Sequence, residues 1–441
     1  MKRILITLIS LGSIFSVSAC SSNETALSKL KQLRSPEGLS HSYNYNETRS
    51  EEYLLFKSKF KSLSTRLSES FAKREFEENK NLALSPLSIE MCLGLAIRSG
   101  SGKTREELLN IFGIDYENFN KYYSLFYNEL SFEKKNSFQQ LLAQLFMTNS
   151  IWIDNDVALL DSGLDALRDD YYCYSYEVDF DKNNKNTNDA ISEFISEKTK
   201  GLIKPNLNLP NEVSFVLMNT LYLKDIWNEE GNDLTYAPAT YKFKNLDGSY
   251  SSKNLLSGQY VLGRTLENDS YSAFKTFTES GFGLYFIKPN QDVDILDVFN
   301  SENIEYVVDE NNYIVLDNGK FERYHTNCIF PEFIGECDTD LKKMFKEDFN
   351  VQTLFDTSCD FSNLARDSVY CEEFKQIAKL EVNKKGIEGA AVTYMAMCGA
   401  SGPDERYTDV YETFVVDKEF GYVLTYNDAI LFSGITTNID A

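Results

Sequence analysis

Histidine is scarce in this chain of 441 residues, where only His41 and His325 occur. His41 lies in a polar N-terminal stretch, which leaves one histidine for any folded site. A catalytic triad built on histidine, or a zinc site with several histidine ligands, is therefore hard to assemble. We expect a protein that is not an enzyme and that uses no metal and no cofactor.

Basic charge is also in short supply, because 44 Lys and Arg stand against 67 Asp and Glu, for a formal net charge of −23. Nucleic-acid binders carry basic patches, so this composition argues against a nucleic-acid partner. It argues equally against a polybasic membrane-surface site. An acidic exterior kept apart by like charge is the simplest interpretation, and we expect a monomer.

CxxC pairs are absent, which excludes the zinc-ribbon and thioredoxin motifs. Seven cysteines follow Cys20, an odd number in a long chain, so a dense disulfide scaffold is not indicated and buried thiols are expected. Apolar residues are plentiful by contrast: they make up 42% of the chain and include 31 Phe and 27 Tyr, enough for a large core.

The N-terminus has the sequence pattern of an export signal. The apolar run from Ile4 to Val17 is too short to span a membrane and has the length of a signal-peptide core. Small residues before Cys20 resemble the bacterial lipoprotein processing box, which implies removal of residues 1–19 and a lipid on Cys20. The expected location is the cell envelope or cell surface, anchored in a membrane; ordinary secretion is the alternative. Residues 20–50 are polar and predict a flexible tether.

Several local patterns predict secondary structure. Ser85 and Pro86 favour the start of a buried helix that runs to about Ile97. Thr104 and Glu107 have the spacing of a capping box for the next helix.

Other patterns predict strands. Residues 213–223 are apolar on both alternating sets, which indicates a central strand covered on both faces. Residues 421–432 contain a turn at Asn427 and Asp428 and predict a β-hairpin. The pattern as a whole is mixed helix and sheet.

A set of segments, taken in this order, resembles the serpin family: residues 84–113, 149–180, 188–203, 215–227, 330–333, 340–355, 381–386, 414–420 and 431–434. The match spans about residues 50–439, and it is the collinear set that is specific. The resemblance implies an α+β serpin domain over 51–441, with three β-sheets, about nine helices and an exposed reactive loop. It also implies a polar cluster beneath the opening of the large sheet, at Ser85, Ser88, Asn219 and Gln376. The family often has His at the position of Gln376, and Gln can donate and accept there.

The segment from Ile387 to Cys398 alternates. One set is uncharged: Ile387, Gly389, Ala391, Thr393, Met395 and Met397. The only charge, Glu388, falls in the other set. This is the pattern of a strand with one face able to enter a core. It is also the pattern of a permanent half-buried strand, which the residues taken alone favour.

The resemblance implies that this loop is offered to a protease as a substrate-like segment. A serine protease, and also a cysteine protease, would attack one bond and form an acyl-enzyme, and the freed strand would insert into the large sheet. The hinge would comprise Gly386, Ile387, Glu388, Gly389, Ala390 and Ala391. Ile387 departs from the Thr or Ser usual in inhibitory members, which is expected to slow insertion.

The reactive bond has two candidates. Counting forward from Gly386 places it near Ala400-Ser401, which suits elastase-like or subtilisin-like proteases and is favoured. Counting back from Phe414 places it near Tyr407, beside Arg406, which suits trypsin-like proteases. Two alternatives to inhibition stay open: a non-inhibitory serpin-fold surface protein, and an envelope solute-binding or adhesion lipoprotein.

Overall fold

The computed structural model describes residues 2–10, 25–38, 46–135, 141–211, 213–227, 234–262, 264–314, 316–317, 320–387 and 407–440. Its centre is β6 (Val213–Ile226), in which every side chain from Val213 to Asp225 is buried. A strand buried on both faces needs cover on both sides, and the surrounding elements supply it. The prediction of a central strand at residues 213–223 is confirmed.

β6 lies in the large sheet of nine strands. The main path runs β15 (Val369–Asn383), β16 (Gly386–Ile387), β6, β4 (Leu141–Asp154), β5 (Cys173–Val178) and β2 (Lys31–Arg34). Three further strands pair beside it: β14 (Phe333–Asp340) with β15, β3 (Phe132–Lys135) with β4, and β1 (Lys2–Ser10) with both β15 and β6. We call the gap between β6 and β15, which is wide enough for one strand, the central position. Its lower part lies beside Val213–Leu217 of β6 and is occupied by the backbone of β1, parallel to both neighbours. Its upper end lies beside Asp225 of β6 and Val382 of β15 and is occupied by β16.

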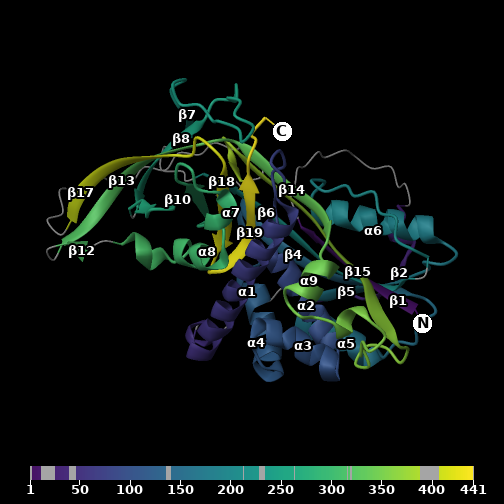
Figure 1. The fold of residues 1–441 in the computed structure, drawn as a ribbon. Coiled ribbons are helices and arrows are strands. Elements are labelled where there is room, and N and C mark those ends of the chain that lie inside the picture. Colours follow the sequence, from purple (N-terminus) through teal and green to yellow (C-terminus); the bar gives the residue numbers. More distant parts are fainter. Residues whose placement is uncertain are drawn as a thin grey trace.

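Nine α-helices occur in the described part of the chain. They are α1 (Glu51–Glu75), α2 (Pro86–Ser99), α3 (Gly102–Phe112), α4 (Tyr116–Glu129), α5 (Asp161–Tyr171), α6 (Asn184–Lys198), α7 (Ile295–Val298), α8 (Ser301–Val307) and α9 (Lys342–Glu347). Four short 3-10 helices accompany them: η1 (Leu27–Lys29), η2 (Glu47–Arg49), η3 (Glu310–Tyr313) and η4 (Thr353–Phe355). The α1–α5 group lies on one side of the large sheet and α6 lies across the other (Figure 1). None of the described helices has both the length and the apolar character to cross a bilayer.

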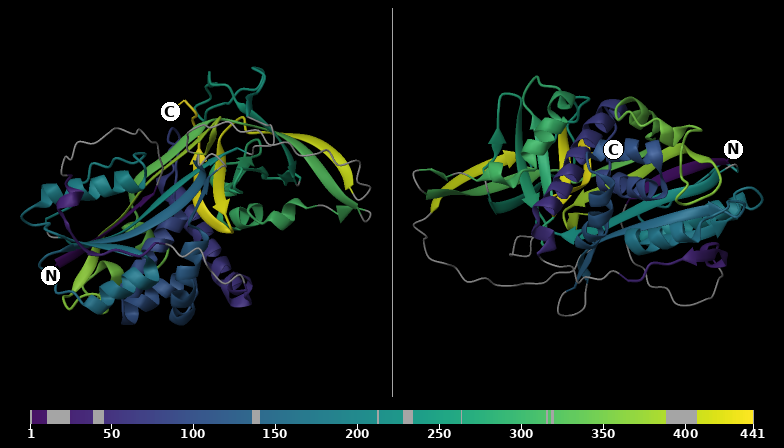
Figure 2. Two further views of the ribbon diagram at one scale, coloured as in Figure 1. Left: turned by 180° about the vertical axis from the view of Figure 1, so that it is seen from behind. Right: turned by 90° about the horizontal axis from the view of Figure 1, so that it is seen from below.

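Two smaller sheets complete the fold. The C-terminal sheet has the order β19 (Ala429–Thr436), β18 (Phe420–Tyr426), β11 (Gly283–Pro289), β10 (Tyr271–Phe277) and β9 (Leu266–Glu267). The arm sheet contains β12 (Leu316–Asp317), β13 (Lys320–Phe330), β8 (Leu256–Leu262), β7 (Thr235–Tyr236) and β17 (Tyr407–Val415). The arm formed by β12, β13 and β17 projects from the body in both orientations of Figure 2.

The predicted hairpin forms, whereas the predicted start of α3 differs. β18 and β19 turn at Asn427 and Asp428, both with positive φ, as predicted. The capping box is wrong: Thr104 accepts from the Asp360 N–H, and Glu107 accepts from Gln352 and Thr353, all far away in sequence. These side chains satisfy neighbouring loops and leave the first turn of α3 uncapped by side chains.

The flexible tether predicted for residues 20–50 also needs correction. β2 pairs antiparallel with β5, and the Leu27 N–H donates to Glu193 on α6 at 2.9 Å. Arg34 Nε lies 2.7 Å from Asp165 Oδ1 on α5. The edge of a sheet offers unpaired backbone groups to any neighbouring extended chain, and composition alone does not reveal such pairing. The folded body therefore includes residues 27–34, ahead of the predicted start at residue 51.

Candidate functional site

The polar residues predicted to lie under the large sheet meet at the start of α2. The Ser85 N–H donates to Gln376 Oε1 at 3.1 Å, and Gln376 Nε2 donates to the Ser85 carbonyl at 3.0 Å. Three residues further along the chain, Ser88 Oγ donates to Asn219 Oδ1 at 2.8 Å. α2 is thus tied to β15 through Gln376 and to β6 through Asn219, and it bridges the central position from below. All four side chains are fully buried.

One expected contact is replaced by another. The Ser85 hydroxyl makes no cap hydrogen bond to its own helix and donates instead to the Leu431 carbonyl on β19 at 2.8 Å. Ser85 still occupies the N-cap position, and Pro86 follows it as predicted. The α2 start is therefore held by two different sheets.

The cluster extends beyond the predicted residues. Asn219 Nδ2 donates to Asn149 Oδ1 at 2.9 Å, and Asn149 Nδ2 donates to Tyr123 Oη and to the Tyr171 carbonyl. Asn149 is fully buried on β4, directly opposite Asn219. A buried amide needs several partners, so an Asn inside an apolar strand is the signal from which this extension could have been found.

The hinge begins in the central position. After β15 the chain turns at Lys384 and Lys385, and β16 then pairs antiparallel with both β15 and β6. Ile387 lies opposite Val382 on one side and Asp225 on the other, and its side chain is fully buried. A Cβ at Gly386 would come within 2.1 Å of the Asp225 carbonyl oxygen, so this close approach requires glycine.

Trp227 and Glu332 hold the turn before the hinge. Trp227 Nε1 donates to the Asn383 carbonyl at 2.8 Å. The Lys384 N–H donates to Glu332 Oε1 at 2.7 Å. The last residues of β15 are therefore fixed by side chains from outside that strand, and the hinge starts from a defined point.

The far end of the loop is fixed on the arm sheet. β17 pairs in parallel with β13 from Tyr407 onward. Asp409 takes a bidentate pair from Arg323, at 2.6 and 3.0 Å, and His325 Nε2 lies 2.8 Å from the same carboxylate. The Arg323 guanidinium holds the pKa of Asp409 well below its usual range. His325, the one histidine available for a folded site, therefore serves in this cross-strand contact.

The remaining predicted residues lie outside the described part of the chain. They are Cys20, Glu388, Gly389, Ala390, Ala391, Ala400, Ser401 and Arg406. Tyr407, the second choice for the reactive bond, is the first residue of β17.

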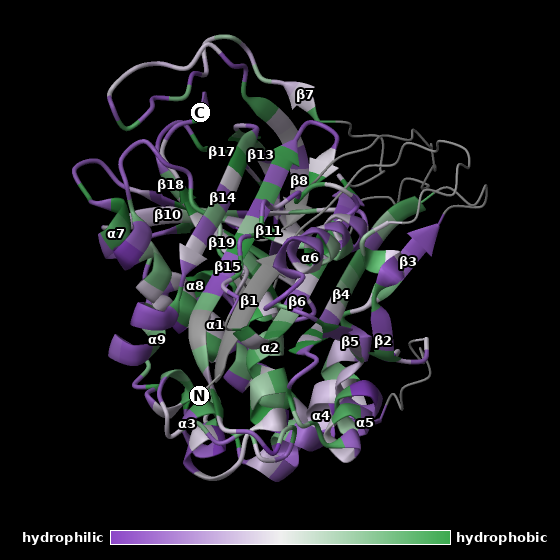
Figure 3. Ribbon diagram, turned by 90° about the vertical axis from the view of Figure 1, so that its right-hand side faces the viewer, coloured by the Kyte–Doolittle hydropathy of each residue, from purple (hydrophilic) through white to green (hydrophobic). Residues whose placement is uncertain are grey.

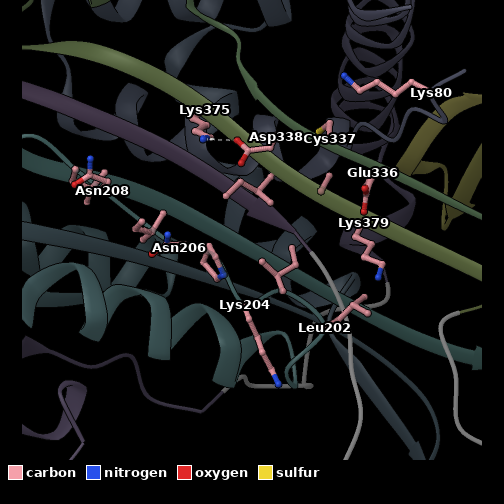
Figure 4. Close-up of a pocket in the computed structure, with 16 residues that line it drawn as sticks. Lys80, Leu202, Lys204, Asn206, Asn208, Glu336, Cys337, Asp338, Lys375 and Lys379 are labelled. Carbon is pink, nitrogen blue, oxygen red and sulfur yellow. Dashed lines mark ion pairs between the residues drawn. The ribbon is translucent and has the colours of Figure 1, made fainter. Parts of the chain in front are cut away.

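A cavity of about 720 Å³ lies over the outer face of β14 and β15 (Figure 4). The connection from α6 to β6, around Lys204 and Asn206, forms its other wall. Figure 4 shows Lys375 and Asp338 paired across its floor. Figure 3 shows α6 in front of the large sheet on this side of the molecule. The outer face of β15 is thus bordered by open, polar space and not by packed core.

Comparison with known proteins decides the family. The model of the family described as "Serpin (serine protease inhibitor)" matches residues 58–439. The chain belongs to the serpin family. It is 23% identical over 385 residues to antitrypsin of Bombyx mori, covering 84% of this chain and 93% of that protein.

Solved serpin structures share the fold. Serpin48 of the insect Tenebrio molitor matches with a TM-score of 0.68 at 20% identity, over 88% of this chain and 99% of that one. The thermophilic serpin tengpin, in its native state, matches with a TM-score of 0.69 at 17% identity, over 93% and 99%. The predicted α+β serpin fold is confirmed, with three sheets and, among the described residues, nine α-helices.

The cysteines of this serpin follow the prediction where they are described. Among the described residues, six cysteines are buried and form no disulfide: Cys92, Cys173, Cys328, Cys337, Cys359 and Cys371. Burial raises the pKa of the Cys92 thiol well above its ordinary value, which keeps it protonated and unreactive. Cys398 lies outside the described residues.

The first prediction concerns the Gln376–Ser85 contact. Gln376→Leu would leave the buried N–H and carbonyl of Ser85 without these partners, at about 1–3 kcal/mol each. We expect the unfolding free energy to fall by about 2–6 kcal/mol, measured by urea denaturation.

Gln259→Leu is the matched control, because Gln259 is exposed on β8. It should change stability by no more than about 0.5 kcal/mol. Equal stability of the Gln376→Leu variant and the unaltered protein would show that this contact does not hold α2 to β15.

Proposed function

We propose that this serpin is a suicide-type inhibitor of serine proteases, with cysteine proteases as a secondary class. The observation that carries the proposal is β16, which already pairs with both β15 and β6 at the upper end of the central position. The strand that would insert after cleavage therefore has its first two residues in place. Insertion would continue an existing pairing and would need no new nucleus.

The chemistry is that of an interrupted proteolysis. The protease nucleophile attacks the carbonyl of the reactive bond, an ester or thioester forms, and the peptide bond breaks with the proton going to the new amine. The freed strand then extends from Ile387 along β6 and β15. The protease, still esterified, is carried to the far end of the sheet and distorted before water can release it.

The burial of Ile387 sets the phase of the inserted strand. Side chains alternate between the faces of a strand, so Gly389, Ala391 and Thr393 would follow Ile387 into the side covered by α2. These residues are small and uncharged. Glu388 and Ala390 would face the α6 side, where the polar cavity lies beside β15. The sequence alternation and the observed burial thus agree on which face is the apolar one.

The lower part of the central position has room for a strand that pairs with both β6 and β15. In the full chain the backbone of β1 pairs there with Val213–Leu217 of β6 and with Val369–Ala378 of β15. Removal of residues 1–19 on export would take β1 away. Both neighbours would then offer backbone groups to the inserting strand, whose pairing would supply free energy for the rearrangement.

The second prediction tests insertion. After incubation with elastase or subtilisin, a denaturing gel should show a covalent complex with the intact protein. Ala391→Arg places a charge in the inward set, so we expect the complex to be lost and the variant to be cleaved as a substrate.

Ala390→Arg adds the same charge to the outward set, and complex formation should persist. The nicked parent protein should also melt well above the intact form, whereas nicked Ala391→Arg should not. Clean cleavage of the parent protein with no complex would instead support a non-inhibitory serpin.

The register of the hinge favours one reactive bond. Ile387 lies opposite Asp225 in antiparallel pairing, so paired residue numbers sum to 387 + 225 = 612. Val213, the first residue of β6, would then face residue 612 − 213 = 399. A strand cut after Ala400 would pair along the whole length of β6, and only one residue would extend beyond Val213. A cut after Arg406 would leave six further residues, about 20 Å of slack, and would involve the edge of β17.

The third prediction follows from this register. Mass spectrometry of the small C-terminal fragment released by elastase should give a peptide that begins at Ser401. A fragment that begins at Tyr407 would contradict the assignment and would indicate a trypsin-like target. Small residues on both sides of the bond at Ala400 suit elastase-like and subtilisin-like proteases.

We further propose that the mature protein is an exported lipoprotein, held to a membrane through lipid on Cys20. The support is the apolar run, the small residues before Cys20 and the polar residues after it. The fourth prediction is that Cys20→Ser moves the protein from the detergent phase to the aqueous phase in a phase-partition assay. Ser22→Ala, two residues away, should stay in the detergent phase. Retention of Cys20→Ser there would contradict lipidation at this residue.

A further inference from the structure

A buried carboxylate lies at the point where the hinge touches β6. The Asp225 side chain is at the end of β6, and the residue is 2% exposed. It accepts from the Ser280 N–H at 2.8 Å, from Ser280 Oγ at 3.3 Å and from the Ile226 N–H at 2.9 Å. Ser280 belongs to the turn between β10 and β11, so the carboxylate ties the end of β6 to the C-terminal sheet.

The backbone of the same residue carries the hinge. Asp225 pairs with Ile387, and its carbonyl oxygen is the atom that excludes a side chain at Gly386. Trp227, two residues on, reaches the other side of the hinge through the Asn383 carbonyl and also bridges to Thr278 of the β10–β11 turn. Any shift of this turn or of Asp225 is therefore passed directly to Gly386 and Ile387.

We propose that Asp225 is a positioning residue for the hinge: its carboxyl group holds the end of β6 on the β10–β11 turn and so fixes where Gly386 and Ile387 meet β6. The established family and the fold do not assign this role. The proposal rests on the proposed function only in that the hinge is taken as the start of the inserting strand.

The physical basis is linkage between charge and burial. Burial raises the pKa of Asp225 from 3.8 to about 6, against the opposing effect of its hydrogen bonds and of Lys134. A raised pKa means that the closed site binds the proton more tightly than an open, hydrated one. The stabilisation of the closed site is fully present below about pH 4 and is lost as the pH rises through about 6.

The neighbouring charges do not replace Asp225 in this role. Lys134 on β3 pairs with Glu279 on the β10–β11 turn at 3.2 Å. Lys224 is adjacent in sequence, and Lys384 and Lys385 form the turn before the hinge. Two other acids lie on elements around the hinge: Glu279 on the β10–β11 turn and Glu332, which accepts from the Lys384 N–H. Glu279 shares the turn with Ser280, so it must be separated from Asp225 in the experiment.

Trp227 provides a reporter at the hinge. The chain has two tryptophans, and Trp152→Phe leaves Trp227 as the only one. Acrylamide quenching of its fluorescence, from pH 4.5 to 8.5, should increase with a midpoint near pH 6 as the hinge site loosens. The rise in pKa allows the opening equilibrium to change by up to about a hundredfold. Should Trp152→Phe fail to fold, the same signal is obtained as the difference between the parent protein and Trp227→Phe.

The variants separate positioning from simple structural support. Asp225→Asn keeps an acceptor without the charge, so quenching should be low and independent of pH. Asp225→Ala removes the acceptor and should be quenched strongly at every pH, while Glu279→Gln should keep the midpoint near 6. A midpoint that persists in Asp225→Asn, one that vanishes in Glu279→Gln, or no pH dependence in the parent protein would overturn the proposal. Because no protease is used, failure of inhibition and failure of this proposal give different results.

Discussion

The pairing of β16 with both β15 and β6 is the interaction on which the rest of the structure depends. Among the described strands, β6 and β15 pair across the central position with β16 and β1 and not with each other. Backbone groups inside a sheet need partners, so the sheet is complete only when a strand fills this place. The α2 contacts to Gln376 and Asn219 tie β15 and β6 to the same helix, one on each side of the central position.

A buried carboxyl group on α2 is a second feature that is costly to ionise in the native fold. Glu90 on α2 is buried, with Ser64 Oγ as a hydrogen-bond donor at 2.8 Å, and burial raises its pKa well above the usual value. A charge there, like the charge on Asp225, is costly in the native fold. Completed pairing of the large sheet would gain ladder hydrogen bonds and apolar burial together. The native state is therefore held by local contacts, and the inserted state would gain from a whole strand.

The features that the sequence predicted correctly depend on residues close together in the chain. The features that it missed depend on contacts with segments far away in the chain. The β6 strand and the Asn427–Asp428 turn follow from periodicity and turn chemistry, which act within a few residues. The capping box at Thr104 failed because loops distant in sequence compete for the same side chains. β2 was missed because its pairing with β5 uses backbone groups that every residue carries. Within the polar cluster, the family resemblance named Ser88 and Asn219. Asn149 inside an apolar strand is a signal of a further buried partner, but only the strand register shows that it lies opposite Asn219.

The pairing of the hinge at Gly386 and Ile387 defines the register from which an inserted strand would be counted. If the loop inserts as proposed, β6 would set the length of the inserted strand, about 13 residues from Asp225 to Val213. The final position of a bound protease would then depend on where the pairing begins. A shift of the pairing by one residue would exchange the side chains that face the core with those that face away from it, and Glu388 would then point into the core. The close approach of Gly386 to the Asp225 carbonyl prevents that shift, because any side chain at this position would collide. In the proposed mechanism, the contact between Gly386 and Asp225 therefore sets the register, and the register would decide both which bond is cleaved and whether the small, uncharged face enters the core.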